Sequence, residues 1–219
     1  MTRKIRYKRL IVLFVFVLVF SFFVYKLFSL RITNIYISGN RYLSDQDIIE
    51  ISSLNNYPRA VFSLSNSIES SIKKSQYVND VKVKKKGFTR IYIDVSENRP
   101  LFFDQIGGET VLMDGSTVND LFNVPILVNS VSSDVYSEFL SKLSLIDMLV
   151  YDNISEIQYV PNDVDNELFL FFMNDGNYIY VNLDRFESVN RYFDMVINFN
   201  NHKGILYLDS GEYFKILDN

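Results

Sequence analysis

The feature that most constrains this chain is an apolar run near its N-terminus. Residues Leu10–Tyr25 read LIVLFVFVLVFSFFVY without one charge, and the run continues to Leu30 with only Lys26 as an interruption. A helix of about 20 residues rises about 30 Å, which is the hydrocarbon thickness of a bilayer. A buried helix of a soluble protein would not be apolar on every face over this length. The sequence therefore predicts one transmembrane helix over residues 10–30.

The flanking charges set the expected orientation of this helix. The segment before it carries five bases and no acid: Arg3, Lys4, Arg6, Lys8 and Arg9. Positive segments stay on the cytoplasmic side, so we expect residues 1–9 to be a cytoplasmic tail and the folded part to be extracytoplasmic. The alternative is a cleaved signal peptide, but residues 25–30 (YKLFSL) show no A-x-A-like cleavage pattern.

The rest of the chain is acidic and contains no cysteine. Seven of the 22 bases lie within residues 1–31, which leaves 15 bases against 26 acids in residues 32–219. An acidic body does not suit nucleic acid as the main ligand, because phosphate contacts need clustered Lys and Arg. Without cysteine, disulfides and thiolate chemistry are excluded, so the outer part must fold on its hydrophobic core alone.

Residues 31–100 are predicted to form a small domain of order β-α-α-β-β. Residues 32–37 have strand composition, and Ser44 followed by Asp47 is a helix-start signal. A second helix is expected over residues 65–75. Two strands then follow, joined by a turn at Lys85-Lys86-Gly87, and both show alternating apolar residues: Val78, Val81 and Val83, then Ile91, Ile93 and Val95.

Residues 101–219 are predicted to form a mixed α/β domain with an antiparallel-rich sheet. Helical spacing of apolar residues indicates helices over 135–149 and 186–198. Three hairpins are expected because Asp, Asn and Gly separate apolar runs; they cover residues 111–118, 168–183 and 205–217. The fold class is therefore α+β: a transmembrane helix, a β-α-α-β-β domain, and this second domain.

Residues that could support catalysis are sparse. The one histidine, His202, lies in a polar stretch at 200–204, and a single histidine cannot build a multi-histidine metal site. The densest acidic group is Asp163, Asp165 and Glu167, which suits either a glycosidase pair or a solvated loop. We predict no catalytic residue, no metal and no cofactor. A membrane-anchored cell-wall hydrolase using paired carboxylates is the alternative.

A basic patch lies on one of the predicted strands. Lys82, Lys84 and Lys86 would share one face, opposite Val81 and Val83. This face is either simply solvated, or a guard against edge pairing, or a contact for anionic lipid or an acidic partner near the bilayer.

The last predicted strand favours recognition of another protein. Residues 213–217 end the second domain, where a strand can occupy a sheet edge and take up a strand from a partner. Tyr213 and Phe214 would supply the aromatic anchors of such a contact. The alternative is that they are core residues of a covered strand.

The order of these features resembles the FtsQ/DivIB family of bacterial cell-division proteins. Residues 35–44 (IYISGNRYLS) resemble the opening of the family's POTRA domain, and residues 77–83 and 91–100 resemble its closing strands. In the second unit, the segments 154–157, 173–177 and 204–214 resemble the family's β domain in order and spacing. The resemblance therefore implies a POTRA domain at 31–100 and a β domain at 101–219.

The resemblance also implies a function. Members are non-enzymatic divisome scaffolds that bind bitopic FtsB/DivIC- and FtsL-type partners outside the membrane and help control septal peptidoglycan synthases. Their β domain takes up the partner as an added strand in its C-terminal part. A POTRA chaperone for outer-membrane insertion is a third interpretation, which expects a β-barrel after the POTRA domain. The tail of about nine residues is short for the family. The partner-binding residues implied here are Tyr207, Leu208, Tyr213, Phe214 and Lys215, with Arg185 as a candidate for pairing with a partner acid.

Overall fold

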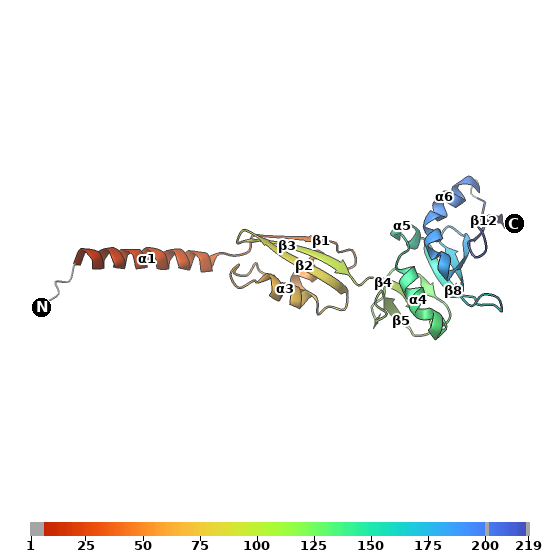
Figure 1. Ribbon diagram of the computed structural model, residues 1–219, viewed down its shortest axis with the longest axis horizontal. Coiled ribbons are helices and arrows are strands. Elements are labelled where there is room, and N and C mark those ends of the chain that lie inside the picture. Colours follow the sequence, from red (N-terminus) through yellow and green to blue (C-terminus); the bar gives the residue numbers. More distant parts are fainter. Residues whose placement is uncertain (1–6, 200–201, 218–219) are drawn as a thin grey trace. The chain divides into compact units, whose positions relative to one another are not determined.

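The computed structural model describes residues 7–199 and 202–217, and the chain forms two compact units, Met1–Asn98 and Arg99–Asn219 (Figure 1). Each unit has a hydrophobic core of its own. Some residues named in the sequence predictions lie outside the described residues: Arg3, Lys4 and Arg6 of the basic tail, and Asn200 and Asn201 of the polar loop.

The apolar run forms helix α1, Tyr7–Ser29, with no buried residue. Within the described residues it is the one helix long and apolar enough to cross a membrane. Its 23 residues rise about 35 Å, which slightly exceeds the hydrocarbon thickness. The helix begins three residues before the predicted start, because Tyr7, Lys8 and Arg9 extend it by nearly one turn.

The first unit also contains a three-stranded sheet of order β1-β3-β2, in which β3 pairs parallel with β1 and antiparallel with β2. The predicted β-α-α-β-β order is confirmed. The elements after α1 are β1 Asn34–Ser38, α2 Asp45–Ile51, α3 Ser65–Ile72, β2 Val78–Lys86 and β3 Arg90–Glu97.

Local signals explain two features of this domain. Ser44 Oγ accepts a hydrogen bond from the Asp47 N–H at 3.1 Å, and the Asp47 carboxylate accepts one from the Ser44 N–H at 2.9 Å, which forms the predicted capping box. The predicted turn was misplaced. Lys85 and Lys86 still belong to β2, and the turn begins at Gly87, whose φ of +65° favours glycine.

The strands of the second unit form one sheet of order β12-β11-β10-β9-β8-β7-β4-β5-β6. Five of its eight neighbouring pairs are antiparallel, and the three predicted hairpins form as β5-β6, β9-β10 and β11-β12. The bounds are β4 Pro100–Asp104, β5 Glu109–Leu112, β6 Thr117–Val118, β7 Ile126–Leu127, β8 Ile154–Tyr159, β9 Leu168–Met173, β10 Tyr178–Asn182, β11 Gly204–Tyr207 and β12 Tyr213–Ile216.

The helical segments differ from prediction in two places. The helix expected over 135–149 is divided into α4 Ser133–Leu143 and α5 Met148–Tyr151, and the Arg99 guanidinium donates to the Ser144 carbonyl at 2.6 Å in the break. The helix expected over 186–198 is mostly 3₁₀: η1 Leu183–Arg191, then α6 Tyr192–Val196 and η2 Ile197–Phe199. Leu183, Phe186 and Val189 are buried three residues apart, which matches three residues per turn.

These helical segments cover one face of the sheet. Phe139 of α4 stacks on Phe169 of β9 with ring centroids 4.8 Å apart, and Phe186 of η1 packs edge-on against Phe169 and Phe171 at 5.3 and 5.2 Å. Along β10 and β11 the inward residues are buried, whereas their neighbours on the other face are only half-buried. At β10 and β11 the sheet therefore has one covered face and one open face.

Candidate partner-binding edge

Strand β12 is an edge of the nine-stranded sheet. Among the described residues it pairs only with β11, and Tyr207 lies opposite Tyr213 in this antiparallel pair. The Leu217 N–H donates to the Lys203 carbonyl at 2.9 Å, so Tyr213, Lys215 and Leu217 direct their backbone groups toward β11. By the alternation of an antiparallel ladder, the backbone groups of Phe214 and Ile216 face away from the sheet.

A column of stacked tyrosines leads to this edge on the open face. Tyr180, Tyr207 and Tyr213 are directly opposite one another on β10, β11 and β12. Their ring centroids are 5.6 Å apart between Tyr180 and Tyr207, and 4.7 Å apart between Tyr207 and Tyr213, with nearly parallel planes. Tyr213 is 53% exposed, so the column ends in an accessible aromatic surface beside the unpaired backbone.

The covered face of the same hairpin is tightly packed. Leu206 is buried, and Phe214 is partly buried with its ring 4.4 Å from that of Phe199. The Phe214 ring and the Lys215 carbonyl lie so close to Gly204 that any Cβ there would collide with both. Glycine at 204 therefore allows β12 to lie against β11.

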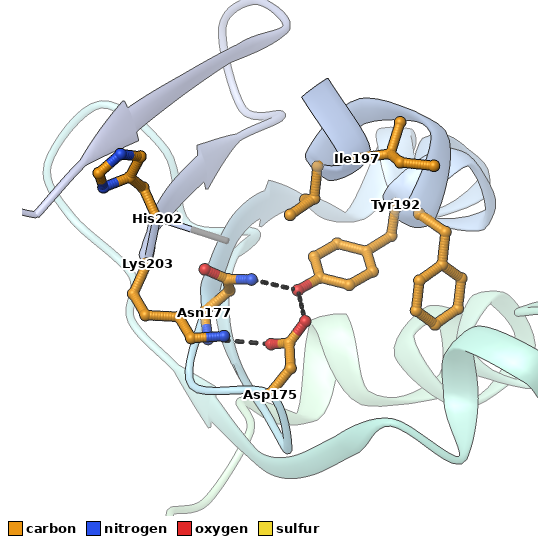
Figure 2. Close-up of a pocket in the computed structure, with 8 residues that line it drawn as sticks. Asp175, Asn177, Tyr192, Ile197, His202 and Lys203 are labelled. Atoms are coloured by element: carbon orange, nitrogen blue, oxygen red, sulfur yellow. Dashed lines mark hydrogen bonds between the residues drawn. The ribbon is translucent and has the colours of Figure 1, made fainter. Parts of the chain in front are cut away.

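A buried polar network fixes the start of β11 (Figure 2). The Asn177 side chain accepts from the Gly204 N–H at 2.9 Å and donates to the Tyr192 hydroxyl at 2.8 Å. The Tyr192 hydroxyl donates in turn to the Asp175 carboxylate at 2.6 Å. Burial and this carboxylate raise the pKa of Tyr192 well above its ordinary value, so the hydroxyl keeps its proton. The β9-β10 turn, α6 and β11 are thereby connected.

A cavity of about 300 Å³ borders this network. Figure 2 shows Ile197 and His202 at its sides. His202 is exposed, and Ile197 is 77% exposed. The described residues contain no group of three or more His, Asp or Glu side chains that could hold a metal ion. The cavity is lined by Asp175, Asn177, Tyr192, Phe193, Val196, Ile197, His202 and Lys203.

Most of the predicted partner-binding residues come together at this edge. Tyr207, Tyr213 and Lys215 share the open face of the hairpin. The Arg185 guanidinium donates to the Gly211 carbonyl at 3.2 Å, so η1 holds this side chain at the β11-β12 turn. Their contact with a partner stays a prediction.

Two residues differ from that prediction. The Leu208 side chain is fully buried, and its N–H donates to the Tyr180 carbonyl at 2.7 Å, so it supports the hairpin and offers no surface to a partner. Ile216 was missed, although it is 42% exposed and its backbone faces outward. The sequence alone could have excluded Leu208 as a contact residue. Side chains alternate along a strand, so Leu206 and Leu208 face one side and Tyr207 faces the other.

The acidic group lies in the loop between β8 and β9. The Asp165 carboxylate accepts hydrogen bonds from the Asn182 side chain at 2.6 Å and from the Glu167 N–H at 2.8 Å. These bonds attach the loop to β10, which is a structural use of Asp165. Burial, followed by the nearby acids Asp184 and Glu138, raises the pKa of the Glu167 carboxyl. Asp163 is exposed to solvent.

The basic patch lies on β2 as expected. Lys82, Lys84 and Lys86 are exposed on one face, while Val81 and Val83 are buried on the other. Lys86 places its ammonium group 4.8 Å from the centre of the Tyr92 ring on β3. Their contact with lipid or with an acidic partner stays a prediction.

Comparison with known proteins shows what this chain is similar to. A family model described as "POTRA domain, FtsQ-type" matches residues 30–98. The cell division protein DivIB of Bacillus subtilis is 24% identical over 196 residues, covering 84% of this chain and 74% of the relative. DivIB of Listeria monocytogenes is 24% identical over 230 residues, covering 97% of this chain and 85% of the relative. The solved major extracytoplasmic domain of DivIB from Geobacillus stearothermophilus is 20% identical, covers 48% of this chain and 96% of that domain, and has a TM-score of 0.39.

The single apolar helix and the domain that follows it define a bitopic membrane protein with a POTRA domain of the FtsQ type. Its relatives of known name are division proteins, matched over most of the chain. Residues 30–98 are similar to FtsQ-type POTRA domains, and the chain is similar over most of its length to DivIB cell division proteins.

Proposed function

We propose that this protein is a non-enzymatic scaffold of the bacterial division machinery at the septum. Residues 1–9 lie in the cytoplasm, α1 crosses the membrane, and both folded units lie outside. Its partners are bitopic proteins of the FtsB/DivIC and FtsL types, through which it regulates septal peptidoglycan synthesis. The division names of its relatives and the basic segment before α1 support this proposal.

The observation that carries the proposal is the outer edge of β12, which no strand of residues 7–199 and 202–217 covers. Phe214 and Ile216 present outward N–H and C=O groups, and an extended partner segment can pair with them as an additional strand. Such backbone pairing supplies affinity for many sequences, so specificity must come from the side chains on either face.

The side chains around this edge suit a partner strand with two features. The tyrosine column ending at Tyr213 favours a planar side chain at the facing position, because offset stacking continues across each added strand. Lys215 and Arg185 place positive charge beside it, which favours an acidic residue in the partner. We expect the bound segment to combine an aromatic or guanidinium group with a carboxylate.

A proline exchange tests strand addition directly. Ile216→Pro removes an outward N–H and no ladder bond to β11, so the hairpin stays intact while the partner loses a hydrogen bond and meets the proline ring. In the full chain in nanodiscs, we expect affinity for a DivIC-type ectodomain to fall by more than about tenfold. Truncation before Tyr213 removes the whole strand and should abolish binding.

The matched control lies at the opposite edge of the same sheet. The Leu112 N–H donates to the Ser116 carbonyl at 2.8 Å, so by the alternation of the β5-β6 ladder Thr117 of β6 turns its backbone outward, as Ile216 does on β12. Thr117→Pro should leave partner affinity unchanged. Unchanged affinity in Ile216→Pro would reject strand addition at β12. Turnover of peptidoglycan by the purified chain, lost in Asp163→Asn or Asp165→Asn, would instead favour the hydrolase.

A further inference from the structure

A second surface lies at the base of the POTRA domain, where the chain leaves α1. Three segments, 26–33, 57–64 and 84–90, are held together here by backbone hydrogen bonds. The Ala60 N–H donates to the Leu30 carbonyl at 2.8 Å, and the Thr33 N–H donates to the Thr89 carbonyl at 2.8 Å. The Lys85 ammonium donates to the Ala60 and Ser63 carbonyls at 2.5 and 2.9 Å, which fixes the middle segment against β2. We call these three segments the basal surface.

The basal surface exposes large apolar side chains. Phe62 is 65% exposed, Leu64 is 62% exposed, and Phe88 in the β2-β3 turn is 64% exposed. Phe62 also lies against Phe28 of α1, with ring centroids 6.2 Å apart. Clustered exposure of this kind on a soluble domain marks an interaction site.

The charge of the basal surface is entirely positive. Its three segments contain no acid and seven bases: Lys26, Arg31, Arg59, Lys84, Lys85, Lys86 and Arg90. The acids of this domain include Asp94, paired with Ser38 at the other end of β1, and Glu97, which accepts from the Tyr42 and Leu43 N–H groups. Since residues 32–219 are strongly acidic overall, this separation of charge is a local property of the base.

We infer that the basal surface binds the anionic lipid of the bilayer into which α1 is inserted. Phe62, Leu64 and Phe88 enter the headgroup boundary, and Arg59, Lys86 and Arg90 contact lipid phosphates. The direct connection to α1 is the reason for assigning the lipid bilayer as the ligand of this surface. Only Leu30 separates the end of α1 from Arg31, whose backbone forms an isolated antiparallel β-bridge with that of Arg59. An extended residue spans about 3.5 Å. The membrane surface is therefore within reach of this patch at all times.

The position along β2 separates the three exposed lysines. Lys86 pairs with Arg90 and Lys84 with Tyr92, whereas Lys82 pairs with Asp94 outside the basal surface. Lys84 and Lys86 therefore belong to the lipid contact, and Lys82, on the same face of the same strand, does not. Basic residues near an anionic membrane each change binding by about fivefold, and the effect is screened by salt.

The chain contains no tryptophan, so one introduced tryptophan reports on its own position. We would place Phe88→Trp in the full chain, reconstituted in vesicles of brominated phosphatidylcholine with or without phosphatidylglycerol. We expect bromine to quench the introduced indole strongly when phosphatidylglycerol is present and less without it or at high salt. Leu64→Trp should behave in the same way. Tyr42→Trp, at the acidic end of the domain, should not be quenched under any of these conditions.

Charge reversal at two lysines on the same face of β2, one inside and one outside the basal surface, gives a variant and its matched control. In the Phe88→Trp background, Lys86→Glu should reduce the anionic-lipid effect by at least about fivefold, while Lys82→Glu should leave it unchanged. Circular dichroism checks that both variants fold. Equal quenching with and without phosphatidylglycerol, or equal effects of the two lysine changes, would overturn the inference. So would fluorescence of the Phe88→Trp variant that is unaffected by lipid but protected from quenchers by an acidic partner domain.

Discussion

Two edge strands of this molecule, β2 of the POTRA sheet and β12 of the larger sheet, differ in what their outward backbone groups contact. On β2, the Val83 N–H points outward and donates to the Glu69 carboxylate of α3 at 2.7 Å. The Val81 N–H donates to the Asp80 carboxylate, which Lys73 holds by an ion pair at 2.7 Å. On β12, the groups of Phe214 and Ile216 face away from β11, and no further strand pairs with them in the described part of the chain.

The difference shows how one chain can carry a closed and an open edge at once. Side-chain acceptors occupy outward N–H groups of β2, and the lysines of β2 discourage the approach of another strand. Both are common protections of edge strands. Strand β12 instead carries aromatic and aliphatic residues with a single lysine. The nine residues of β2 would make it the longer template, yet the outward N–H groups of Val81 and Val83 are already satisfied by side chains. Of these two edges, strand addition is therefore expected at β12.

The largest effect should come from a substitution in β11 that displaces β12 from the sheet. Gly204→Ala places a Cβ against the Lys215 carbonyl and the Phe214 ring, and overpacking of this kind costs about 1–3 kcal/mol. We expect β12 to separate from β11 and partner affinity to fall by about 100-fold. Amide hydrogen exchange over residues 204–217 and a binding isotherm measure the two effects.

Gly211→Ala is the control in the same hairpin. A Cβ there would meet only Tyr213 at 3.7 Å, an ordinary van der Waals contact. If Gly211→Ala lost protection as completely as Gly204→Ala, the close approach at Gly204 would not be what holds the edge in place.

The second effect tests the closed edge. Glu69→Ala leaves the Val83 N–H without its acceptor, and losing a hydrogen bond to a charged group costs about 1–3 kcal/mol. We expect denaturant unfolding of the POTRA domain to shift by that amount. We also expect the full chain in detergent to associate with rising concentration in sedimentation, because β2 becomes a template. Glu69→Gln keeps an acceptor oxygen and should remain close to wild type; association in both variants would contradict the protective role.

The third effect tests the aromatic specificity of the open edge. Tyr213→Ala removes the exposed end of the tyrosine column, and we expect partner affinity to fall about tenfold with little loss of stability. The POTRA sheet offers a matched stack, Tyr36 on Tyr92 at 4.7 Å, also on an edge strand. Tyr36→Ala should leave affinity unchanged. Equal losses in both variants would show that stacking affects binding through general stability.

The elements that could be predicted from the sequence are those fixed by neighbouring residues. Ser44 and Asp47 alone determine the start of α2, and Asp175-Gly176 alone determines the β9-β10 turn. Strand β7 has only two residues and exists because it lies between β4 and β8, far away in the chain. Nothing local marks such a strand.

The candidate site shows the same limit. The region of the edge could be predicted, because a terminal hairpin is visible in the sequence. The outward groups at Phe214 and Ile216 depend on the register between β11 and β12, and the network of Asn177, Tyr192 and Gly204 depends on long-range packing. The 3₁₀ segment was misread because the spacing of Phe193 and Val196 suggested an α-helix, while Leu183, Phe186 and Val189 already followed a period of three.

The smallest effect should be a dependence of the closed edge on acid. The hydrogen bond from Lys73, followed by that from the Val81 N–H, lowers the pKa of the Asp80 carboxyl below its ordinary 3.8. Because the folded pKa lies below the unfolded one, the stability that Asp80 contributes is complete above about pH 4 and is lost as the pH falls through the folded pKa. The Asp80 side chain is 49% exposed, so this contribution is small and is weakened by salt. Denaturant midpoints of wild type and Asp80→Asn should therefore differ above about pH 4 and converge in stronger acid. A difference that persisted in strong acid would mean that Asp80 protects β2 by its shape and not by its charge.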